Sequence, residues 1–206
     1  MTYIFSLSQS LQMQVNTYTF VNHRIKLITE KNMVTNSSEL FPLVDKDGKV
    51  IGKATRKECH SGSFLLHPVV HLHVFNSKNE LYLQKRSMEK DIQPGKWDTS
   101  VGGHIDFREE IEHALFREAN EELGIEGFTP LFIGSYVHTS AFESELVYSF
   151  YTFYDGSITP DPIEISEGKF WSIDQIQQTI QEDGFTSNFK QEFRDFIQQL
   201  DFIKNA

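Results

Sequence analysis

The feature that most constrains the fold is the segment GGHIDFREEIEHALFREANEELGI (residues 102–125), which combines helical periodicity with acids on its apolar side. At about 100° per residue, Ile111 and Leu115 lie about 40° apart and define an apolar stripe. Glu118 and Glu122 fall within about 20° of Ile111 on the same wheel. The predicted helix therefore turns carboxylates toward the side on which it packs.

The acids of this helix, which we predict over residues 109–123, form a cluster. Glu118, Glu121 and Glu122 are spaced i, i+3, i+4 and are neighbours on one face. Like charges that close raise one another's pKa unless a cation lies among them. A solvated acidic face would lie opposite the apolar stripe. We therefore favour a site for a hard divalent cation, Mg²⁺ or Mn²⁺, which binds carboxylate oxygens. Gly124 is the expected helix C-cap.

The composition fits one globular domain that acts on a small molecule. The chain has 206 residues, of which 13% are aromatic, so it is long enough to bury a core. Its net charge of −10 argues against a broad nucleic-acid interface. A bound metal can still invert the local field and allow a phosphorylated ligand. Cys59, the single cysteine, excludes an intramolecular disulfide and a cysteine-cluster metal site.

No targeting signal is evident in the sequence. No apolar run approaches the ~20 residues that span a membrane. The first residues, MTYIFSLSQSLQMQ, lack the basic and apolar regions of a signal peptide. We therefore expect a cytoplasmic protein without membrane association.

The N-terminal part differs from the rest, so we divide the chain into an extension, residues 1–37, and a domain, residues 38–206. Residues 1–32 contain three basic residues and one acid and offer no clear motif. Met33 begins a more coherent segment. Either Met33 is the true start and the preceding residues are an upstream misreading, or the extension is a short appended strand or arm.

The domain alternates strands and helices. The turn signal DKDG predicts a hairpin of residues 43–45 and 49–53. Two further strands flank residues 76–79, and SMEKDIQPGKWDTS reads as a loop. The segments FTPLFIGSYVHTS and ELVYSFYTFYDG predict strands. This order implies an α/β fold with a mixed sheet and helices on its faces.

Two helices are expected in the C-terminal part. SIDQIQQTIQED predicts a helix that is capped by Ser172 or Asp174. The last helix begins near Ser187 and carries a core-facing stripe at helical spacing, formed by Phe189, Phe193, Phe196 and Leu200.

The acidic segment fits the Nudix box, G-x5-E-x7-R-E-U-x-E-E-x-G-U, where U is usually bulky and aliphatic. Gly103 is followed at the required spacings by Glu109 and Arg117. The remaining fixed positions are Glu118, Glu121, Glu122, Gly124 and Ile125. Only Ala119 is smaller than usual, and Arg108 stands where many members have glycine. The chain thus resembles the Nudix hydrolases.

This resemblance implies an α/β/α sandwich that cleaves a nucleoside diphosphate linked to another moiety. It also implies Mg²⁺ ligands at Glu118, Glu121 and Glu122, with the Gly103 carbonyl as an additional ligand. Glu109 and Arg117 would pair and hold the loop to the helix. The metal would neutralise the diphosphate and activate the attacking water. Either Glu121 or Glu122 could act as the base.

A second resemblance connects residues 40–180 with the Nudix branch that contains isopentenyl-diphosphate isomerase. WDTSVGGH, residues 97–104, is similar to the isomerase motif W-T-N-S-V-C-G-H. The isomerase binds a further metal through three histidines and two glutamates, whose positions here are His60, His67, His104, Glu143 and Glu145. Either this metal site is real, or the positions are inherited without an ion. His71 and His73, outside this pattern, are predicted to be structural.

One departure from the isomerase motif decides the predicted function. The isomerase cysteine that acts as an acid/base is replaced by Gly102, which carries no titratable group. The hydrolytic box, by contrast, is complete. We therefore expect a Mg²⁺-dependent pyrophosphohydrolase acting on a nucleotide-type substrate. The alternatives are an isopentenyl-diphosphate isomerase and a non-catalytic Nudix-fold binding module.

The sequence leaves the substrate open. Arg86 and Lys85 follow a predicted strand and are candidates to contact phosphate. Trp97, with Phe107, Tyr136 and Phe142, is a candidate to stack on a base, although such aromatics are as often core residues. The expected partner is a small diphosphate, not a nucleic-acid polymer, and a homodimer is common in the family.

Overall fold

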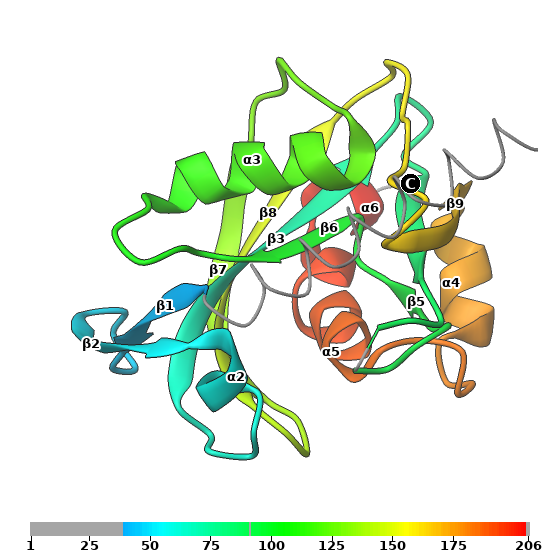
Figure 1. Ribbon diagram of the computed structural model, residues 1–206. Coiled ribbons are helices and arrows are strands. Elements are labelled where there is room, and N and C mark those ends of the chain that lie inside the picture. Colours follow the sequence, from blue (N-terminus) through cyan, green and yellow to red (C-terminus); the bar gives the residue numbers. More distant parts are fainter. Residues whose placement is uncertain (1–38, 91, 205–206) are drawn as a thin grey trace, which may run out of the picture.

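The computed structural model describes residues 39–90 and 92–204. The extension 1–37 and the start hypothesis at Met33 therefore lie outside the described residues. In Figure 1 a central sheet runs through the molecule, with α3 (Ile111–Leu123) over one face and α5 (Ser187–Asp195) under the other. The predicted α/β/α sandwich with a mixed sheet is confirmed.

The main sheet is built around β3 (Leu66–Phe75), which pairs in parallel with β8 (Ser144–Phe153) along its full length. The strand order is β5-β4-β3-β8-β7, where β4 is Leu81–Arg86, β5 is Trp97–Asp98 and β7 is Leu131–Thr139. Every other described pairing in this sheet is antiparallel. The strands expected on both sides of residues 76–79 are confirmed.

Two strands share one edge of β3, and this division positions the site. β6 (Val101–His104) pairs with Val69–Leu72 of β3. β4 pairs with the end of the same edge, where Leu81 of β4 is opposite Phe75 of β3. The sheet therefore opens between β4 and β6, beneath the C-terminal half of α3.

The two faces of the sheet have separate apolar cores because side chains alternate along a strand. Val70 and Leu72 of β3 pack with Leu115 and other residues of α3. Phe75 packs instead on the α5 side, in a core that includes Phe189 and Phe193. α4 (Ile173–Thr179) contributes Ile176 to this second core.

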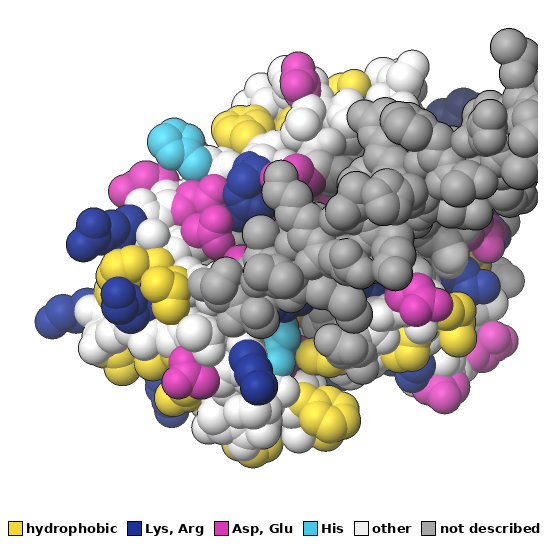
Figure 2. All heavy atoms as spheres, in the orientation of Figure 1, with side chains coloured by type: hydrophobic (Ala, Val, Ile, Leu, Met, Phe, Trp, Pro, Cys, Tyr) yellow, Lys and Arg dark blue, Asp and Glu magenta, His cyan; other side chains and the backbone are white. Residues whose placement is uncertain are grey.

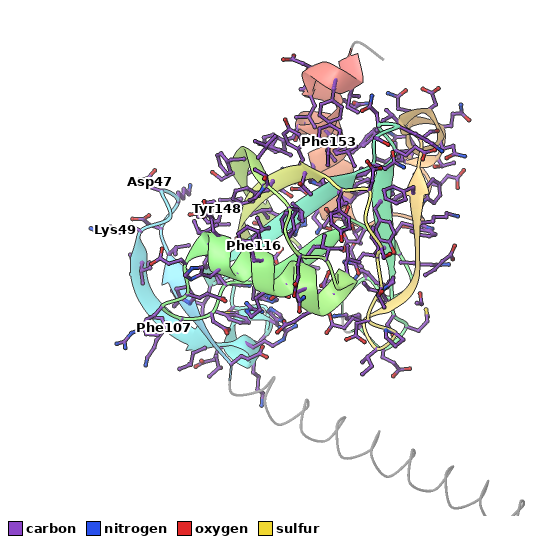
Figure 3. The ribbon with its side chains drawn as sticks, turned by 90° about the horizontal axis from the view of Figure 1, so that it is seen from above. Asp47, Lys49, Phe107, Phe116, Tyr148 and Phe153 are labelled. Atoms are coloured by element: carbon purple, nitrogen blue, oxygen red, sulfur yellow. The ribbon has the colours of Figure 1, made fainter. Side chains whose placement is uncertain are left out.

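The predicted hairpin is observed as a separate two-stranded sheet of β1 (Leu40–Val44) and β2 (Val50–Thr55). The Asp45 carboxylate accepts hydrogen bonds from the backbone N–H groups of Asp47 and Lys49, at 3.0 and 2.9 Å. Figure 3 shows Asp47 and Lys49 at the tip of this hairpin. The short helix α2 (Arg56–Cys59) follows it directly.

Some sequence predictions were wrong in detail. α3 begins at Ile111 rather than residue 109, so Glu109 lies in the preceding loop. Trp97 and Asp98, predicted as loop, form β5 against β4. The sequence analysis also missed β9 (Ile165–Trp171), which pairs with β4 through residues 79 to 90 positions earlier in the chain, from Arg86↔Ile165 to Leu81↔Trp171.

The C-terminal helices follow the prediction with one change. Ser172 is the N-cap of α4 and forms a capping box with Gln175, which decides between the two candidates. α5 ends at Asp195, because Phe196 has φ −126° and leaves the helical conformation. Leu200 reaches the core through the 3₁₀ turn η1 (Ile197–Gln199), and α6 (Asp201–Lys204) follows.

Candidate active site

Gly103 on β6 lies directly against the acidic helix. A Cβ at this position would meet the Glu118 side chain, which would have to move. β6 and the side of α3 that carries Glu118 are therefore in direct contact. Arg108, in the loop between them, has φ +77°, the left-handed conformation that glycine favours. The loop thus keeps its glycine-like geometry although the residue differs.

Arg117 joins this loop to the helix. Its Nε and one terminal nitrogen donate to the two carboxylate oxygens of Glu109, at 2.9 and 2.8 Å. The same guanidinium donates to Glu118 at 2.7 Å and to the carbonyl of His104 at 3.0 Å. This bidentate pair is the one predicted from the sequence, and its rigid geometry orients the start of the acidic face.

Glu122 is the most deeply placed acid of α3. It accepts a hydrogen bond from the Gln84 side-chain amide at 2.8 Å and from the Gly102 backbone N–H at 3.3 Å. Both donors are neutral, and no ion pair to Glu122 is found within the described residues. Gln84 could not be identified as a site residue from the sequence, because it belongs to β4 and lies 38 positions before Glu122, the residue that it contacts.

Burial and mutual repulsion raise the pKa values of Glu118 and Glu122. Burial raises the pKa of Glu118 to about 7, although Arg117 opposes the shift. Burial also raises the pKa of Glu122 well above its ordinary value, and the charges of Glu118 and Glu164 add to this effect. Glu164, which pairs with Lys90 at 3.0 Å, is a further acid of this site that the sequence analysis missed.

Glu121 lies apart from the other two acids. Its side chain is 59% exposed and accepts a hydrogen bond from Arg117 at 3.2 Å. The structure therefore brings Glu118 and Glu122 to the β6 edge and leaves Glu121 at the rim.

A second cluster lies on the opposite side of β6, toward α5. His60, His67, His104 and Glu143 each offer one ligand atom, and these atoms all lie within 4.8 Å of one another. Nε2 of His60 is 3.0 Å from Nε2 of His104 and 3.1 Å from Oε2 of Glu143. The predicted second set thus converges, except for Glu145, which faces His67 in the β3–β8 register but is outside this group.

The chemistry of this cluster suits a metal. Burial lowers the pKa of His60 to about 3, and it also lowers the pKa values of His67 and His104, which favours the neutral imidazole that binds a metal. Burial, with the charge of Glu145, raises the pKa of Glu143 to about 8. Nε2 of His67 is buried without a hydrogen-bond partner among the described residues, and Oε2 of Glu143 has only its contact with His60. A cation would satisfy these two atoms.

Comparison with known proteins identifies the family of this chain. The family model described as NUDIX domain matches residues 65–193. The chain belongs to the Nudix family.

Relatives of this Nudix protein carry two kinds of name. Over 164 residues it is 35% identical to isopentenyl-diphosphate Delta-isomerase 1 of Photorhabdus laumondii, across 76% of this chain and 93% of that protein. Over 88 residues it is 39% identical to an uncharacterized Nudix hydrolase of Nostoc, across 43% of this chain and 52% of that protein.

Solved Nudix structures share the fold. The crystal structure of DR0079 from Deinococcus radiodurans superposes with a TM-score of 0.67 at 23% identity, over 76% of this chain and 98% of that chain. The MutT protein from Methanosarcina mazei gives a TM-score of 0.55 at 22% identity, over 63% and 91%.

The predicted substrate residues of this Nudix domain are already engaged by protein groups. The Arg86 guanidinium donates to Asp98 at 3.1 Å and to the carbonyl of Ile92 at 3.1 Å. Trp97 packs edge-on against Trp171, with the ring centroids 5.1 Å apart, and the Lys85 ammonium lies over its ring. Trp97 is thus half-buried beside the α5-side core, which favours the structural reading of this residue.

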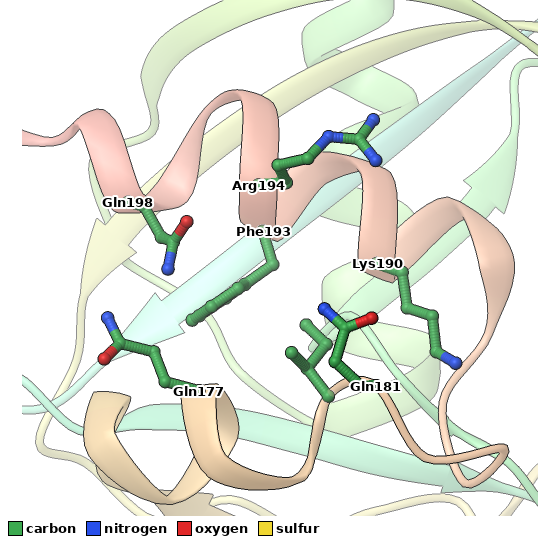
Figure 4. Close-up of a pocket in the computed structure, with 7 residues that line it drawn as sticks. Gln177, Gln181, Lys190, Phe193, Arg194 and Gln198 are labelled. Atoms are coloured by element: carbon green, nitrogen blue, oxygen red, sulfur yellow. The ribbon is translucent and has the colours of Figure 1, made fainter.

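The wider surface adds two observations. Figure 2 shows Lys and Arg scattered among acidic side chains on the face in view. A hollow of about 470 Å³ lies between α4 and α5 (Figure 4), and no predicted site residue lines it. Within the part of the chain that the structure describes, no helix is long and apolar enough to cross a membrane.

Proposed function

We propose that this protein is a divalent-metal-dependent hydrolase that cleaves a diphosphate linkage in a nucleotide-type substrate. The observation that carries the proposal is Glu122, a buried carboxylate beside Glu118 and Glu164 that is hydrogen-bonded only by neutral donors. A cation among these acids would remove their repulsion, since nearby positive charge favours the ionised form of a carboxyl group. The donors are carboxylate oxygens, which suit Mg²⁺ or Mn²⁺.

The residues have distinct proposed roles. Glu118, Glu121 and Glu122, with the Gly103 carbonyl, would hold the cation. When bound, it would neutralise the diphosphate and lower the pKa of water. Arg117 and Glu109 fix the loop against α3, and either Glu121 or Glu122 accepts the proton of the attacking water. Arg86, Lys85 and Trp97 remain weaker candidates for substrate contacts because protein groups already engage them.

The cluster of His60, His67, His104 and Glu143 supports a second proposed metal position, with Glu145 nearby. It also favours the alternative function, an isopentenyl-diphosphate isomerase, since the relative from Photorhabdus laumondii bears that name. Against this alternative stands Gly102, which has no side chain to exchange a proton with a substrate. A non-catalytic binding module is the third possibility, and the complete Nudix box argues against it. Cytoplasmic location and a homodimer stay predictions.

The test is release of phosphate and pyrophosphate by the purified protein with Mg²⁺. The panel holds nucleoside di- and triphosphates, sugar nucleotides, dinucleotides and isopentenyl diphosphate. Release that is lost in Glu122→Gln, and kept in the matched surface variant Glu112→Gln on the same helix, supports the hydrolase. No release from any compound, together with isomerisation of isopentenyl diphosphate, would establish the alternative.

A further inference from the structure

Two rings of the histidine cluster, as we call the group of His60, His67, His104 and Glu143, have their protons fixed in opposite ways. Nδ1 of His67 is 2.9 Å from the backbone carbonyl oxygen of Leu65, which only accepts hydrogen bonds. The neutral His67 ring therefore carries its proton on Nδ1 and keeps a lone pair on Nε2, the atom that is buried without a partner. A metal-binding histidine usually has this arrangement, in which the second ring nitrogen donates to an oxygen.

His104 has the opposite arrangement, because Arg56 and not an oxygen faces its Nδ1. A terminal nitrogen of Arg56 lies 3.2 Å from Nδ1 of His104. A guanidinium has donors only, so Nδ1 accepts a hydrogen bond and the proton of the neutral ring is on Nε2. Nε2 is the atom that faces the rest of the cluster, 3.0 Å from Nε2 of His60. The lone pair of His104 is therefore directed away from the cluster.

The other contacts of the cluster agree with this placement of the proton. With its proton on Nε2, His104 donates to Nε2 of His60. The lone pair of that nitrogen is then used, and Oε2 of Glu143, 3.1 Å from the same atom, receives no hydrogen bond. Within the described residues, the atoms of the cluster that are buried without a hydrogen-bond partner are Nε2 of His67 and Oε2 of Glu143. These are the two atoms that this chain of donors leaves over.

Neighbouring groups hold Arg56 beside His104. Arg56 is the first residue of the short helix α2, and its guanidinium lies 3.5 Å from the carboxylate of Glu39. The guanidinium carbon is 6.0 Å from the ring centroid of Phe41. The Phe41 ring stacks in turn on the His104 ring, with the centroids 4.3 Å apart. Arg56 and His104 thus share one aromatic neighbour, which keeps the guanidinium and the imidazole side by side.

This arrangement opposes a cation in the cluster. A cation binds His104 through Nε2 only if the ring proton moves to Nδ1, where it faces the donor of Arg56. The cation also brings a second positive charge close to the guanidinium, and like charges repel. Glu39 offers the guanidinium another partner, so Arg56 weakens metal binding without preventing it.

We propose that Arg56 sets the metal affinity of the histidine cluster by holding the proton of His104 on Nε2. The cluster is then a weak and exchangeable position for a cation that accepts imidazole and carboxylate ligands, such as Zn²⁺. This inference rests on the second metal position of the proposed function, because it assigns the residue that regulates that position. It is independent of the acids of α3 and of the reaction proposed there.

The first test measures metal affinity. Metal-free protein is titrated with Zn²⁺ in a calorimeter, with Mg²⁺ in excess to occupy the acids of α3. Arg56→Gln removes the charge and supplies a carbonyl oxygen that accepts a hydrogen bond from Nδ1 of His104. We expect it to bind Zn²⁺ at least about tenfold more tightly than the wild type, the lower end of the effect of a residue hydrogen-bonded to a metal ligand.

Two controls accompany this titration. Lys57→Gln removes the same charge from the neighbouring exposed position of α2, and should change the Zn²⁺ affinity less than twofold. His67→Ala should abolish the tight binding of Arg56→Gln, which assigns the titrated site to the histidine cluster.

The second test locates the proton. Nuclear magnetic resonance spectra that correlate imidazole nitrogens with ring hydrogens distinguish the two neutral forms of histidine. In metal-free protein we expect the proton of His104 on Nε2 in the wild type and on Nδ1 in Arg56→Gln. Arg56→Met, which removes the guanidinium and supplies no acceptor, should also bind Zn²⁺ more tightly and keeps the test valid if Arg56→Gln fails to fold.

The outcomes are separable. A His104 proton on Nδ1 in the wild type, unchanged or weaker Zn²⁺ binding in Arg56→Gln, or an equal gain in Lys57→Gln would overturn the inference. No Zn²⁺ binding in any variant would overturn it together with the second metal position, and phosphate release would still test the hydrolase by itself. Tighter binding in Arg56→Gln with the expected change of proton position would support it, even if the protein released no phosphate.

Discussion

Glu122 on α3 and Glu192 on α5 are two buried glutamates on opposite faces of the sheet, with 5% and 0% exposure. Burial by itself raises the pKa of both. At Glu122 the neighbouring acids Glu118 and Glu164 raise it further. At Glu192, His71 and His73 outweigh burial and hold the pKa far below its ordinary value. The protein therefore places positive charge in direct contact with Glu192, whereas at Glu122 the charge of Lys90 opposes the shift without forming an ion pair.

Burial alone therefore does not identify an acidic residue as functional. Glu192 forms an ion pair with His71 through one carboxylate oxygen, whereas Glu122 accepts hydrogen bonds only from neutral groups. A buried acid that forms no ion pair is the one that a metal completes. The following experiments test this contrast, in order of the expected effect.

The largest effect is expected on turnover. Glu122→Gln should lower kcat by at least about 100-fold at saturating Mg²⁺, because a bound metal supplies several kcal/mol of charge stabilisation. Glu121→Gln should also abolish turnover, and circular dichroism should show an intact fold for both. Full activity in the two variants would remove the metal assignment.

Stability should respond in opposite directions at the two glutamates. Glu192→Gln should lower the free energy of unfolding by about 3 kcal/mol, since it leaves a buried histidine without its counter-charge. Glu122→Gln should not lower it in metal-free protein, because it removes an unfavourable buried charge. Urea denaturation with EDTA measures both, and equal losses would contradict the contrast.

The ion pair between His71 on β3 and Glu192 on α5 should also make the stability of the fold depend on pH. Burial lowers the pKa of His71, but Glu192 raises it to about 9. Its stabilising contribution is therefore complete below the unfolded-state pKa near 6.5 and is lost as pH rises through about 9. This loss should be visible in the urea midpoints of the wild type and absent in Glu192→Gln.

Glu118 should also lower stability as pH rises, but in a lower pH window and with a smaller effect. Its folded-state pKa of about 7 lies above the ordinary value of 4.5. Metal-free protein should thus lose stability, on the order of 2 kcal/mol, as pH rises from about 4.5 to about 7. Saturating Mg²⁺ should remove most of this loss, and Glu118→Gln should reduce it, because Glu122 and Glu143 also have raised pKa values and contribute the remainder. A wild-type profile that is flat with EDTA would refute the shift.

The smallest functional effect is expected at the histidine cluster. His67→Ala should reduce the metal content of purified protein, because Nε2 of His67 is one of its buried unpartnered atoms. Elemental analysis against the wild type measures the change. An unaltered metal content would leave these residues a structural role only.

Periodic and motif-based features were predictable from the sequence. The acidic helix, the β1–β2 hairpin, the Glu109–Arg117 pair and four of the five candidate ligands of the second cluster, all but Glu145, follow from local spacing or from resemblance. Local hydrogen-bonding geometry and the period of side chains are properties of neighbouring residues, which a sequence displays directly.

Long-range partners were not predictable. Gln84 of β4 and Glu164, in the loop before β9, lie at the acids of α3, and Glu192 of α5 pairs with His71. None of these residues belongs to a motif. His71 and Glu192 lie 121 positions apart. β9 was missed for the same reason, since its partner strand is distant in the chain.

The sequence by itself determined that acids share a helix face with an apolar stripe, that Gly102 replaces an acid/base group, and that the chain folds as a mixed sheet between helices. Only the tertiary structure decided which buried acid has a cation beside it, that Glu121 lies at the rim, and which ring nitrogen of His104 faces Arg56. The physical reason is that ionisation and hydrogen-bond satisfaction depend on the charges and donors within a few ångströms, which packing brings together from remote segments.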